Sequence, residues 1–204
     1  MASSSIAVLD YGMGNLLSVE RALAHVGGSA EITGDPARVA GADALVIPGV
    51  GHFGACMRAL AHRGLDDAVR AFAGTGRPVF GVCLGMQVLF KRSDEDGEEG
   101  LTIIPGQSRK LPPNVKVPHM GWNDVEWIDK HPYIEGIPTR TRFYFVHSFA
   151  PDVVAGTTVG ATTYGRPFSS VVASGNVFAT QFHPEKSGDA GLQLYEAFVK
   201  GAAA

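Results

Sequence analysis

The sequence predicts an α/β fold in which an open, mostly parallel sheet carries helices on both faces and an additional β-rich C-terminal half. Three observations support this prediction. Before about residue 100, short apolar runs alternate with segments of helical periodicity, and glycine-rich turns separate them. After that point, β-rich runs follow one another among frequent prolines and glycines. A length of 204 residues fits one domain, so we expect residues 1–204 to form a single domain.

The first half should contain four strands, each followed by helical sequence. Apolar runs that end at polar or glycine-rich turns predict strands at residues 6–9, 30–33, 44–47 and 78–82. Apolar residues at helical spacing predict helices at residues 16–26, 53–61, 65–72 and 84–90. Asn15 stands where it could cap the first of these helices.

The second half should complete the same domain with further strands. Short β-rich runs predict strands at residues 124–128, 142–147, 157–164, 169–172 and 177–183. An amphipathic helix is expected at residues 188–201.

Composition narrows the function classes. The net charge is −3 and no run of Lys or Arg occurs, which argues against binding to nucleic acid. Two cysteines are too few for a secreted disulfide scaffold. The N-terminus lacks the basic flank and apolar length of a signal peptide, and no apolar run reaches the roughly 20 residues of a membrane helix. We therefore expect a cytoplasmic protein that contacts neither membrane nor nucleic acid.

Cys83 lies between two glycines in GVCLG, where an apolar strand gives way to a helix. This pattern is typical of a nucleophile elbow, a tight strand-to-helix turn that needs small neighbours. A helix beginning near Leu84 would favour the thiolate, and the Leu84 N–H could donate to an oxyanion. The alternative is a buried structural cysteine. Cys56, in the helical pattern GACMRAL, has only that interpretation.

His183 is the best candidate for the base that a nucleophilic cysteine needs. It stands in TQFHPEKS, where Pro184 favours extended backbone at His183. Residues two apart in extended chain point the same way, so Glu185 can orient the imidazole. The alternative is a histidine that ends a strand near a surface acid.

The glycine turn PGVG follows the predicted strand at residues 44–47. Its Val50 and Gly51 N–H groups are candidate oxyanion donors. Because glycines flank Val50, its peptide planes could rotate, and a switchable oxyanion hole is a further hypothesis. The remaining histidines, including His52, His119 and His147, have no ligand-like spacing, so no metal site is predicted.

Together, GVCLGMQ, TQFHPEKS and the intervening PGVG loop resemble the class I, triad-type glutamine amidotransferases over nearly the whole chain. The resemblance implies a flavodoxin-like sheet and no cofactor. It implies that the Cys83 thiolate attacks the side-chain amide of glutamine, that His183 protonates the departing ammonia, and that a glutamyl thioester is then hydrolysed. By motif matching it also implies six substrate contacts, at Gly49, Gly51, Gln87, Glu95, Ser148 and Phe149. The family more often has tyrosine at position 149, so Phe149 can offer only a backbone contact.

Further segments, namely DYGMGN, PGVGHF, PHMGWN and YFVHSF, resemble the branch of this family that serves histidine biosynthesis. That resemblance implies a heterodimer with a (β/α)8-barrel cyclase subunit, HisF, which uses the ammonia to make imidazole glycerol phosphate and AICAR. It implies a partner interface at Met13, Asn15, Met120, Trp122, Tyr144 and Lys186. For PHMGWN the alternative is a turn leading into a strand, with Trp122 as a core aromatic residue.

Three other functions are compatible with parts of the pattern. The first is a glutaminase of another pathway, such as pyridoxal phosphate or anthranilate synthesis, although PHMGWN and YFVHS argue against it. The second is a cysteine peptidase or γ-glutamyl hydrolase of similar topology. The third is a non-catalytic scaffold, which would usually lack a member of the triad.

Overall fold

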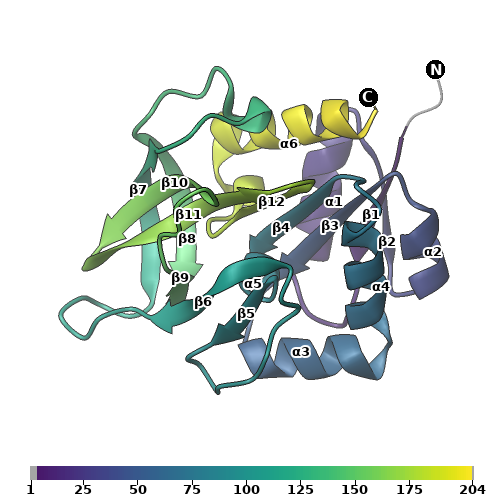
Figure 1. The fold of residues 1–204 in the computed structure, drawn as a ribbon. Helices are drawn as coiled ribbons and strands as arrows, with labels where there is room; N and C mark the ends of the chain where they lie inside the picture. Colours follow the sequence, from purple (N-terminus) through teal and green to yellow (C-terminus); the bar gives the residue numbers. More distant parts are fainter. Residues whose placement is uncertain (1–3, 204) are drawn as a thin grey trace.

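The computed structural model describes residues 4–203, which form a nine-stranded sheet, a three-stranded sheet and six α-helices (Figure 1). The large sheet contains β1 (Ser5–Leu9), β2 (Ser29–Thr33), β3 (Ala44–Gly49), β4 (Val79–Cys83), β7 (His119–Trp127), β8 (Thr141–His147), β10 (Thr158–Tyr164), β11 (Arg166–Ser174) and β12 (Val177–Thr180). The small sheet contains β5 (Phe90–Ser93), β6 (Ile104–Lys110) and β9 (Phe149–Pro151). The helices are α1 (Leu16–His25), α2 (Pro36–Gly41), α3 (Phe53–His62), α4 (Leu65–Ala73), α5 (Leu84–Gln87) and α6 (Gly188–Ala202), with single 3-10 turns η1 (Pro132–Ile134) and η2 (Pro184–Lys186).

The large sheet joins the two halves of the sequence. Its order is β2-β1-β3-β4-β12-β11-β10-β7-β8, parallel from β2 to β12 and antiparallel from β12 to β8. The last strand of the chain, β12, therefore lies in the middle of the sheet, beside β4. Because β4 and β12 are parallel, the residues that follow them meet at the same edge of the sheet.

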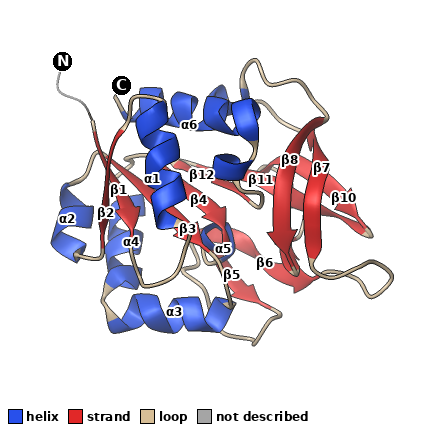
Figure 2. Ribbon diagram, turned by 180° about the vertical axis from the view of Figure 1, so that it is seen from behind, coloured by secondary structure: helices blue, strands red, loops and turns tan. Residues whose placement is uncertain are grey.

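Helices cover both faces of the parallel strands (Figures 1 and 2), with α1 and α6 on one face and α2, α3 and α4 on the other. Alternate residues of each strand point to opposite faces, so β1 contributes Ile6 and Val8 to one core and Ala7 and Leu9 to the other. The predicted fold class is confirmed. None of the helices in residues 4–203 is long and apolar enough to cross a membrane.

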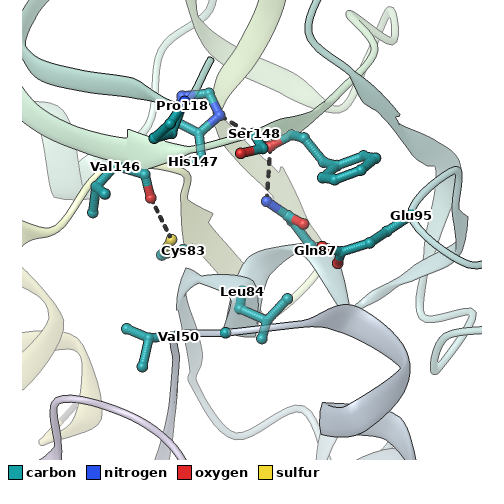
Figure 3. A pocket seen from close by; sticks show the side chains of 11 residues that line it. Val50, Cys83, Leu84, Gln87, Glu95, Pro118, Val146, His147 and Ser148 are labelled. Atoms are coloured by element: carbon teal, nitrogen blue, oxygen red, sulfur yellow. Dashed lines mark hydrogen bonds between the residues drawn. The ribbon is translucent and has the colours of Figure 1, made fainter.

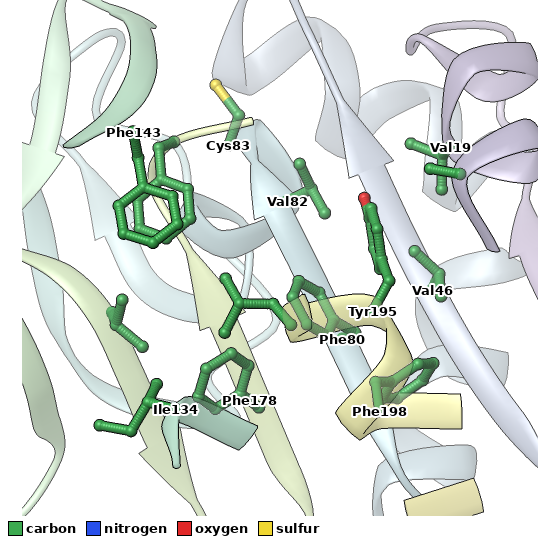
Figure 4. Close-up of a cluster of buried hydrophobic side chains, with 14 of the residues drawn as sticks. Val19, Val46, Phe80, Val82, Cys83, Ile134, Phe143, Phe178, Tyr195 and Phe198 are labelled. Carbon is green, nitrogen blue, oxygen red and sulfur yellow. The ribbon is translucent and has the colours of Figure 1, made fainter. Parts of the chain in front are cut away.

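Aromatic side chains fill the core between the sheet and α6 (Figure 4). Phe80 of β4 lies 5.2 Å from the ring of Phe178 and 5.4 Å from the rings of Tyr195 and Phe198. Such aromatic pairs contribute about 0.5–1.5 kcal/mol each beyond their buried area. They anchor β4 and β12 beneath Cys83, which lies at the edge of this cluster with its sulfur pointing away from the rings.

Several helices and strands have bounds that differ from the predicted ones. The helix expected at residues 84–90 ends at Gln87, because Phe90 instead pairs with Ile104 in the small sheet. The last strand ends at Thr180 rather than at residue 183. Asn15 stands before α1, but its side chain makes no capping hydrogen bond, so that prediction is wrong.

Other elements were not predicted. Helix α2 begins where the Asp35 carboxylate accepts from the Ala37 N–H at 2.9 Å, with Pro36 in the first turn. Strand β7 begins at His119, so PHMGWN is mostly strand and not a turn. Trp122 is 48% exposed, and its interpretation as a core residue is wrong.

Candidate active site

Cys83 ends β4 and directly precedes α5, with φ +55° and ψ −109°. A left-handed φ is costly for a residue with a side chain, and such strain is common at active sites. The chain can turn here because Gly85 lies against the Ile47 carbonyl, where a Cβ atom would have no room. The predicted strand-to-helix elbow is present.

The Cys83 side chain is only 5% exposed and reaches a cavity of about 310 Å³ (Figure 3). Its sulfur lies 3.8 Å from the Val146 carbonyl oxygen, to which the thiol can donate. The Gln181 amide Nε2 lies 3.7 Å from the same sulfur and donates to it. The sulfur is thus held by polar groups from β8 and from the segment after β12.

His183 and Glu185 follow β12 at the sheet edge where Cys83 follows β4. His183 Nδ1 lies 2.8 Å from Glu185 Oε1, and both side chains are almost completely buried. Burial opposes the charged imidazole, but the Cys83 thiolate and the Glu185 carboxylate outweigh burial and raise the pKa of His183 to about 10. A protonated His183 facing a thiolate is the arrangement that attack by sulfur requires.

Glu185 has a second partner. Asn15 Nδ2 donates to Glu185 Oε1 at 3.2 Å, which explains why Asn15 does not cap α1. Within residues 4–203, His183 Nε2 and Glu185 Oε2 are buried without a hydrogen-bond partner. The Nε2 atom is therefore available to exchange a proton with a reacting group.

The cavity brings together most of the residues predicted to contact substrate and oxyanion. Its lining consists of Val50, Gly51, Cys83, Leu84, Gln87, Glu95, Pro118, Val146, His147, Ser148 and Phe149. Gly49 lies behind this wall, and an added Cβ there would come within 2.6 Å of the Gly85 nitrogen. Gly49 thus allows the loop after β3 to approach α5, and its substrate contact stays a prediction.

Glu95 faces the cavity from the loop after β5 (Figure 3). One carboxylate oxygen accepts from the Phe53 N–H at 2.7 Å, so Glu95 binds the first turn of α3. The other oxygen lies 3.9 Å from His52 Nε2, a long contact that leaves it able to accept from a ligand ammonium group.

Gln87 and Phe149 contact each other across the cavity wall. The Gln87 Nε2 donates to the Phe149 carbonyl at 2.9 Å and to Gln181 Oε1 at 3.1 Å. Both N–H groups of Gln87 are therefore used within the protein, and its Oε1 atom is the group left for a substrate donor. The Phe149 carbonyl is likewise engaged by protein donors, from Gln87 and from His147.

Tyr11 supports the PGVG loop, because its hydroxyl donates to the Pro48 carbonyl at 2.7 Å. Gly51 has φ +105°, a conformation that favours glycine, and Val50 is 39% exposed at the rim of the cavity. Which of the Val50, Gly51 and Leu84 N–H groups binds an oxyanion stays a prediction.

The residues predicted to contact a partner do not line the cavity, and several belong to elements that also supply site residues. Met120 and Trp122 are exposed on β7, and Trp122 packs edge to face on Tyr144 of β8 with ring centroids 6.1 Å apart. The Tyr144 backbone accepts from the His183 N–H at 3.0 Å. Lys186 is exposed directly after Glu185, and Met13 lies 3.8 Å from the position of a Cβ atom on Gly51. Asn15 differs, because its side chain is directed to Glu185.

Sequence reasoning missed Gln181, Val146, His147 and Tyr11. All four lie inside the motifs TQFHPEKS, YFVHSF and DYGMGN, but a motif does not say which of its members contact the site. Cys56 is fully buried in α3, and burial raises the pKa of its thiol to about 12, as expected for a structural cysteine. Among residues 4–203, no three His, Cys, Asp or Glu side chains are grouped in a way that could hold a metal ion.

Comparison with known proteins gives the class to which this fold and site correspond. The family model "Glutamine amidotransferase class-I" matches residues 7–201. The chain belongs to this family. A crystal structure of a glutamine amidotransferase, 22% identical, has a TM-score of 0.77 with 98% of this chain and 99% of that chain covered. PurLQS from Thermotoga maritima, 17% identical, has the same TM-score and the same coverage.

Two curated relatives are more similar in sequence, and both are named "Imidazole glycerol phosphate synthase subunit HisH". That of Symbiobacterium thermophilum is 50% identical over 191 residues, which cover 93% of this chain and 90% of the relative. That of Moorella thermoacetica is 45% identical over 199 residues, covering 95% of this chain and 93% of the relative.

Proposed function

We propose that this protein hydrolyses L-glutamine to glutamate and ammonia, as the glutaminase subunit of an imidazole glycerol phosphate synthase in histidine biosynthesis. The observation that carries the proposal is the strained Cys83 at the 310 Å³ cavity, with the buried His183–Glu185 pair at the same sheet edge. The pathway is that named for the relatives of Symbiobacterium thermophilum and Moorella thermoacetica, which are 50% and 45% identical.

The first half of the reaction makes a thioester. The Cys83 thiolate attacks the side-chain amide carbon, so a C–S bond forms and the carbonyl electrons move to oxygen. Candidate N–H donors at Val50, Gly51 and Leu84 stabilise this oxyanion. When the intermediate collapses, the C–N bond breaks and His183 gives its proton to the departing nitrogen, which leaves as ammonia.

The second half returns the enzyme to its starting state. His183, now neutral, takes a proton from water as the water oxygen attacks the thioester carbon. A second oxyanion forms and collapses, the C–S bond breaks, and glutamate leaves with the sulfur again a thiolate paired with protonated His183. Glu185 keeps the imidazole oriented through its 2.8 Å contact to Nδ1.

The cavity wall offers groups that suit the α-ammonium of glutamine. Glu95 supplies a carboxylate oriented by the Phe53 N–H, and Gln87 supplies its Oε1 atom. Both line the cavity with Ser148 and Phe149. A peptide substrate would have its nitrogen acylated, so it would not bring this charge to Glu95.

The partner we propose is a (β/α)8-barrel cyclase subunit, HisF, which forms a heterodimer over the mouth of the cavity and receives the ammonia. Met13, Asn15, Met120, Trp122, Tyr144 and Lys186 are the proposed contacts. The exposed apolar area of Met120 and Trp122 favours a protein interface. The continuous sheet supports one domain over the whole chain, and we propose a cytoplasmic location with the other enzymes of the pathway.

The test measures glutamate release from glutamine with and without the purified cyclase subunit and its nucleotide ligand. We expect strong stimulation by the cyclase, loss of activity in Cys83→Ala, and retained activity in the matched control Cys56→Ala. Fast turnover that ignores the cyclase would contradict the synthase assignment but keep the nucleophile. If the folded complex released no glutamate, glutamine would not be the substrate.

A further inference from the structure

The carbonyl oxygen of Phe149 sets the direction of a buried chain of amide groups that ends at the sulfur of Cys83. A carbonyl only accepts hydrogen bonds, so Gln87 must turn its Nε2 toward Phe149, at 2.9 Å. The second N–H of Gln87 donates to Gln181 Oε1 at 3.1 Å. Since Gln181 Oε1 faces Gln87, the Gln181 Nε2 faces the sulfur, 3.7 Å away.

A pair of buried histidines approaches the same carbonyl from the other side. His147 Nδ1 lies 2.9 Å from the Phe149 oxygen and therefore carries a hydrogen. Burial lowers the pKa of His147 to about 3, so the ring is neutral at pH 7 and its Nε2 atom must accept. The donor is His119 Nδ1 at 2.9 Å, and His119 Nε2 in turn accepts from Asn123 at 3.3 Å.

These contacts allow only one assignment of hydrogen-bond donors and acceptors. Both histidines are Nδ1–H tautomers, and both lone pairs of the Phe149 oxygen are occupied by donors from opposite sides. Gln87 and Gln181 therefore cannot flip their amides without leaving buried groups unpaired, which costs about 1–3 kcal/mol for each group. The orientation of the Gln181 N–H toward Cys83 is fixed by the structure around it.

We propose that Gln181 is a positioning residue that holds an N–H on the Cys83 thiolate. The proposal rests on the proposed function in one respect, that Cys83 is the nucleophile. A thiolate accepts a hydrogen bond far better than a thiol does, so a fixed donor favours the charged form. It also holds the sulfur on the side of the cavity where the Gln181 amide lies.

Other groups also act on this sulfur. His183, which contacts Glu185, faces the sulfur from the segment after β12. Burial raises the pKa of Tyr11, in the loop after β1, and the charge of Cys83 adds to this effect. Glu95 lies across the cavity. Gln181 is the neutral donor in this set, and removing it leaves every charged group in place. A change at Gln181 therefore removes the N–H that faces the sulfur, together with the Oε1 atom that accepts from Gln87.

The test compares Gln181→Met with the matched control Thr180→Val. Methionine has nearly the same length as glutamine but no N–H. Thr180 is an equally buried neighbour whose hydroxyl donates to the Phe182 carbonyl at 3.0 Å. The measurements are the pH dependence of Cys83 alkylation by iodoacetamide, located by peptide mapping, and kcat and KM for glutamine in the complex with the cyclase subunit.

We expect the alkylation midpoint of Gln181→Met to rise by about one to two pH units, as loss of one hydrogen bond to a charged group predicts. The kcat value should fall about tenfold while KM changes less than about twofold, and Thr180→Val should resemble the wild type. An unchanged midpoint and kcat in Gln181→Met would overturn the proposal. A raised midpoint in a protein that hydrolyses no glutamine would overturn the proposed function and support the role of Gln181.

A measurement on the wild-type protein covers the case in which Gln181→Met does not fold. Proton–nitrogen correlation spectra of the histidine side chains distinguish the two tautomers. Nδ1–H tautomers for both His119 and His147 at pH 7 would support this assignment of donors and acceptors. A protonated Nε2 on His147 would show that the ring does not donate to Phe149, and the inference that donors occupy both lone pairs of that oxygen would be wrong.

Discussion

At the scale of single residues, the site depends on contacts that motifs only partly indicate. His183 and Glu185 were predicted as a pair because a proline places residues two apart on one side of extended chain. Asn15, more than 160 residues earlier, completes the contacts of Glu185. Local sequence carries no signal for such a long-range contact, and the resemblance had placed Asn15 at the partner interface.

Asn15→Ala should lower kcat for glutamine hydrolysis about tenfold with little change in KM, because the buried Glu185 carboxylate loses one of its two hydrogen-bond partners. Steady-state kinetics at saturating cyclase subunit checks this. Leu17→Ala, an exposed substitution in the first turn of α1, is the control. If only the affinity for the cyclase changed, Asn15 would be an interface residue and not a support of Glu185.

The buried histidines predict a dependence of stability on pH. Burial lowers the pKa of His119 to about 4 and that of His147 to about 3, whereas both titrate near 6.5 in an unfolded chain. The unfolded state therefore binds protons first as pH falls. The stabilisation is complete above pH 6.5. It is lost between pH 6.5 and about 4 for His119, and between pH 6.5 and about 3 for His147, by about 1.4 kcal/mol per pH unit for each.

Urea unfolding at pH 7.0 and 5.0 measures this loss. His119→Gln should remove one histidine's share, about 2 kcal/mol of the difference between the two pH values. His62→Gln, an exposed change on α3, should leave the difference as in the wild type. Equal differences in all three proteins would mean that His119 titrates normally in the folded state.

At the scale of elements, the turn between β4 and α5 combines a strained residue with close backbone contacts. Sequence predicted this turn because glycines two residues on either side of Cys83 have a physical reason to be there. It did not predict that α5 would stop after one turn. The helix stops there since the chain continues into β5, where Phe90 pairs with Ile104. The small sheet was missed since its strands are short and mostly polar.

Gly85→Ala should destabilise the protein by about 3 kcal/mol or more and abolish glutaminase activity, because the new Cβ would overlap the Ile47 carbonyl on β3. Gly41→Ala is the control, since nothing lies within 4 Å of its new Cβ at the exposed end of α2. That change should be neutral or stabilise by about 0.5 kcal/mol. Thermal unfolding and glutamate release measure both, and similar effects at the two positions would contradict the role of the close contact.

At the scale of the whole molecule, the order of the strands determines where the site forms. The alternation of strands and helices was enough to predict a sheet covered on both faces. It could not predict that β12 lies between β4 and β11, because strand pairing over such distances leaves no local pattern. The sequence predicted that Cys83 and His183 act together, because a nucleophilic cysteine needs a base. The pairing of β4 with β12 explains why the two residues lie at the same edge of the sheet.

The exposed face of β7 and β8 should contribute strongly to the complex with the cyclase subunit. Trp122→Ala should weaken binding about 30-fold, since aromatic residues dominate interface energies at about 2 kcal/mol or more. Ile128→Ala, which removes an exposed apolar side chain just beyond the end of β7, should change the affinity less than about twofold. Isothermal titration calorimetry measures the affinity of each variant for the cyclase subunit. Equal losses of affinity in the two variants would place the interface elsewhere.

The central position of β12 has a consequence for synthesis on the ribosome. A nascent chain that has reached Cys83 must still be extended by all of residues 84–183 before His183 exists, about 5 to 20 seconds at ordinary elongation rates. During that time the apolar edge of β4 has no neighbour on one side and is open to pairing with other chains. Until residues 84–183 have been translated, the chain therefore lacks its catalytic base and has greater need of chaperones.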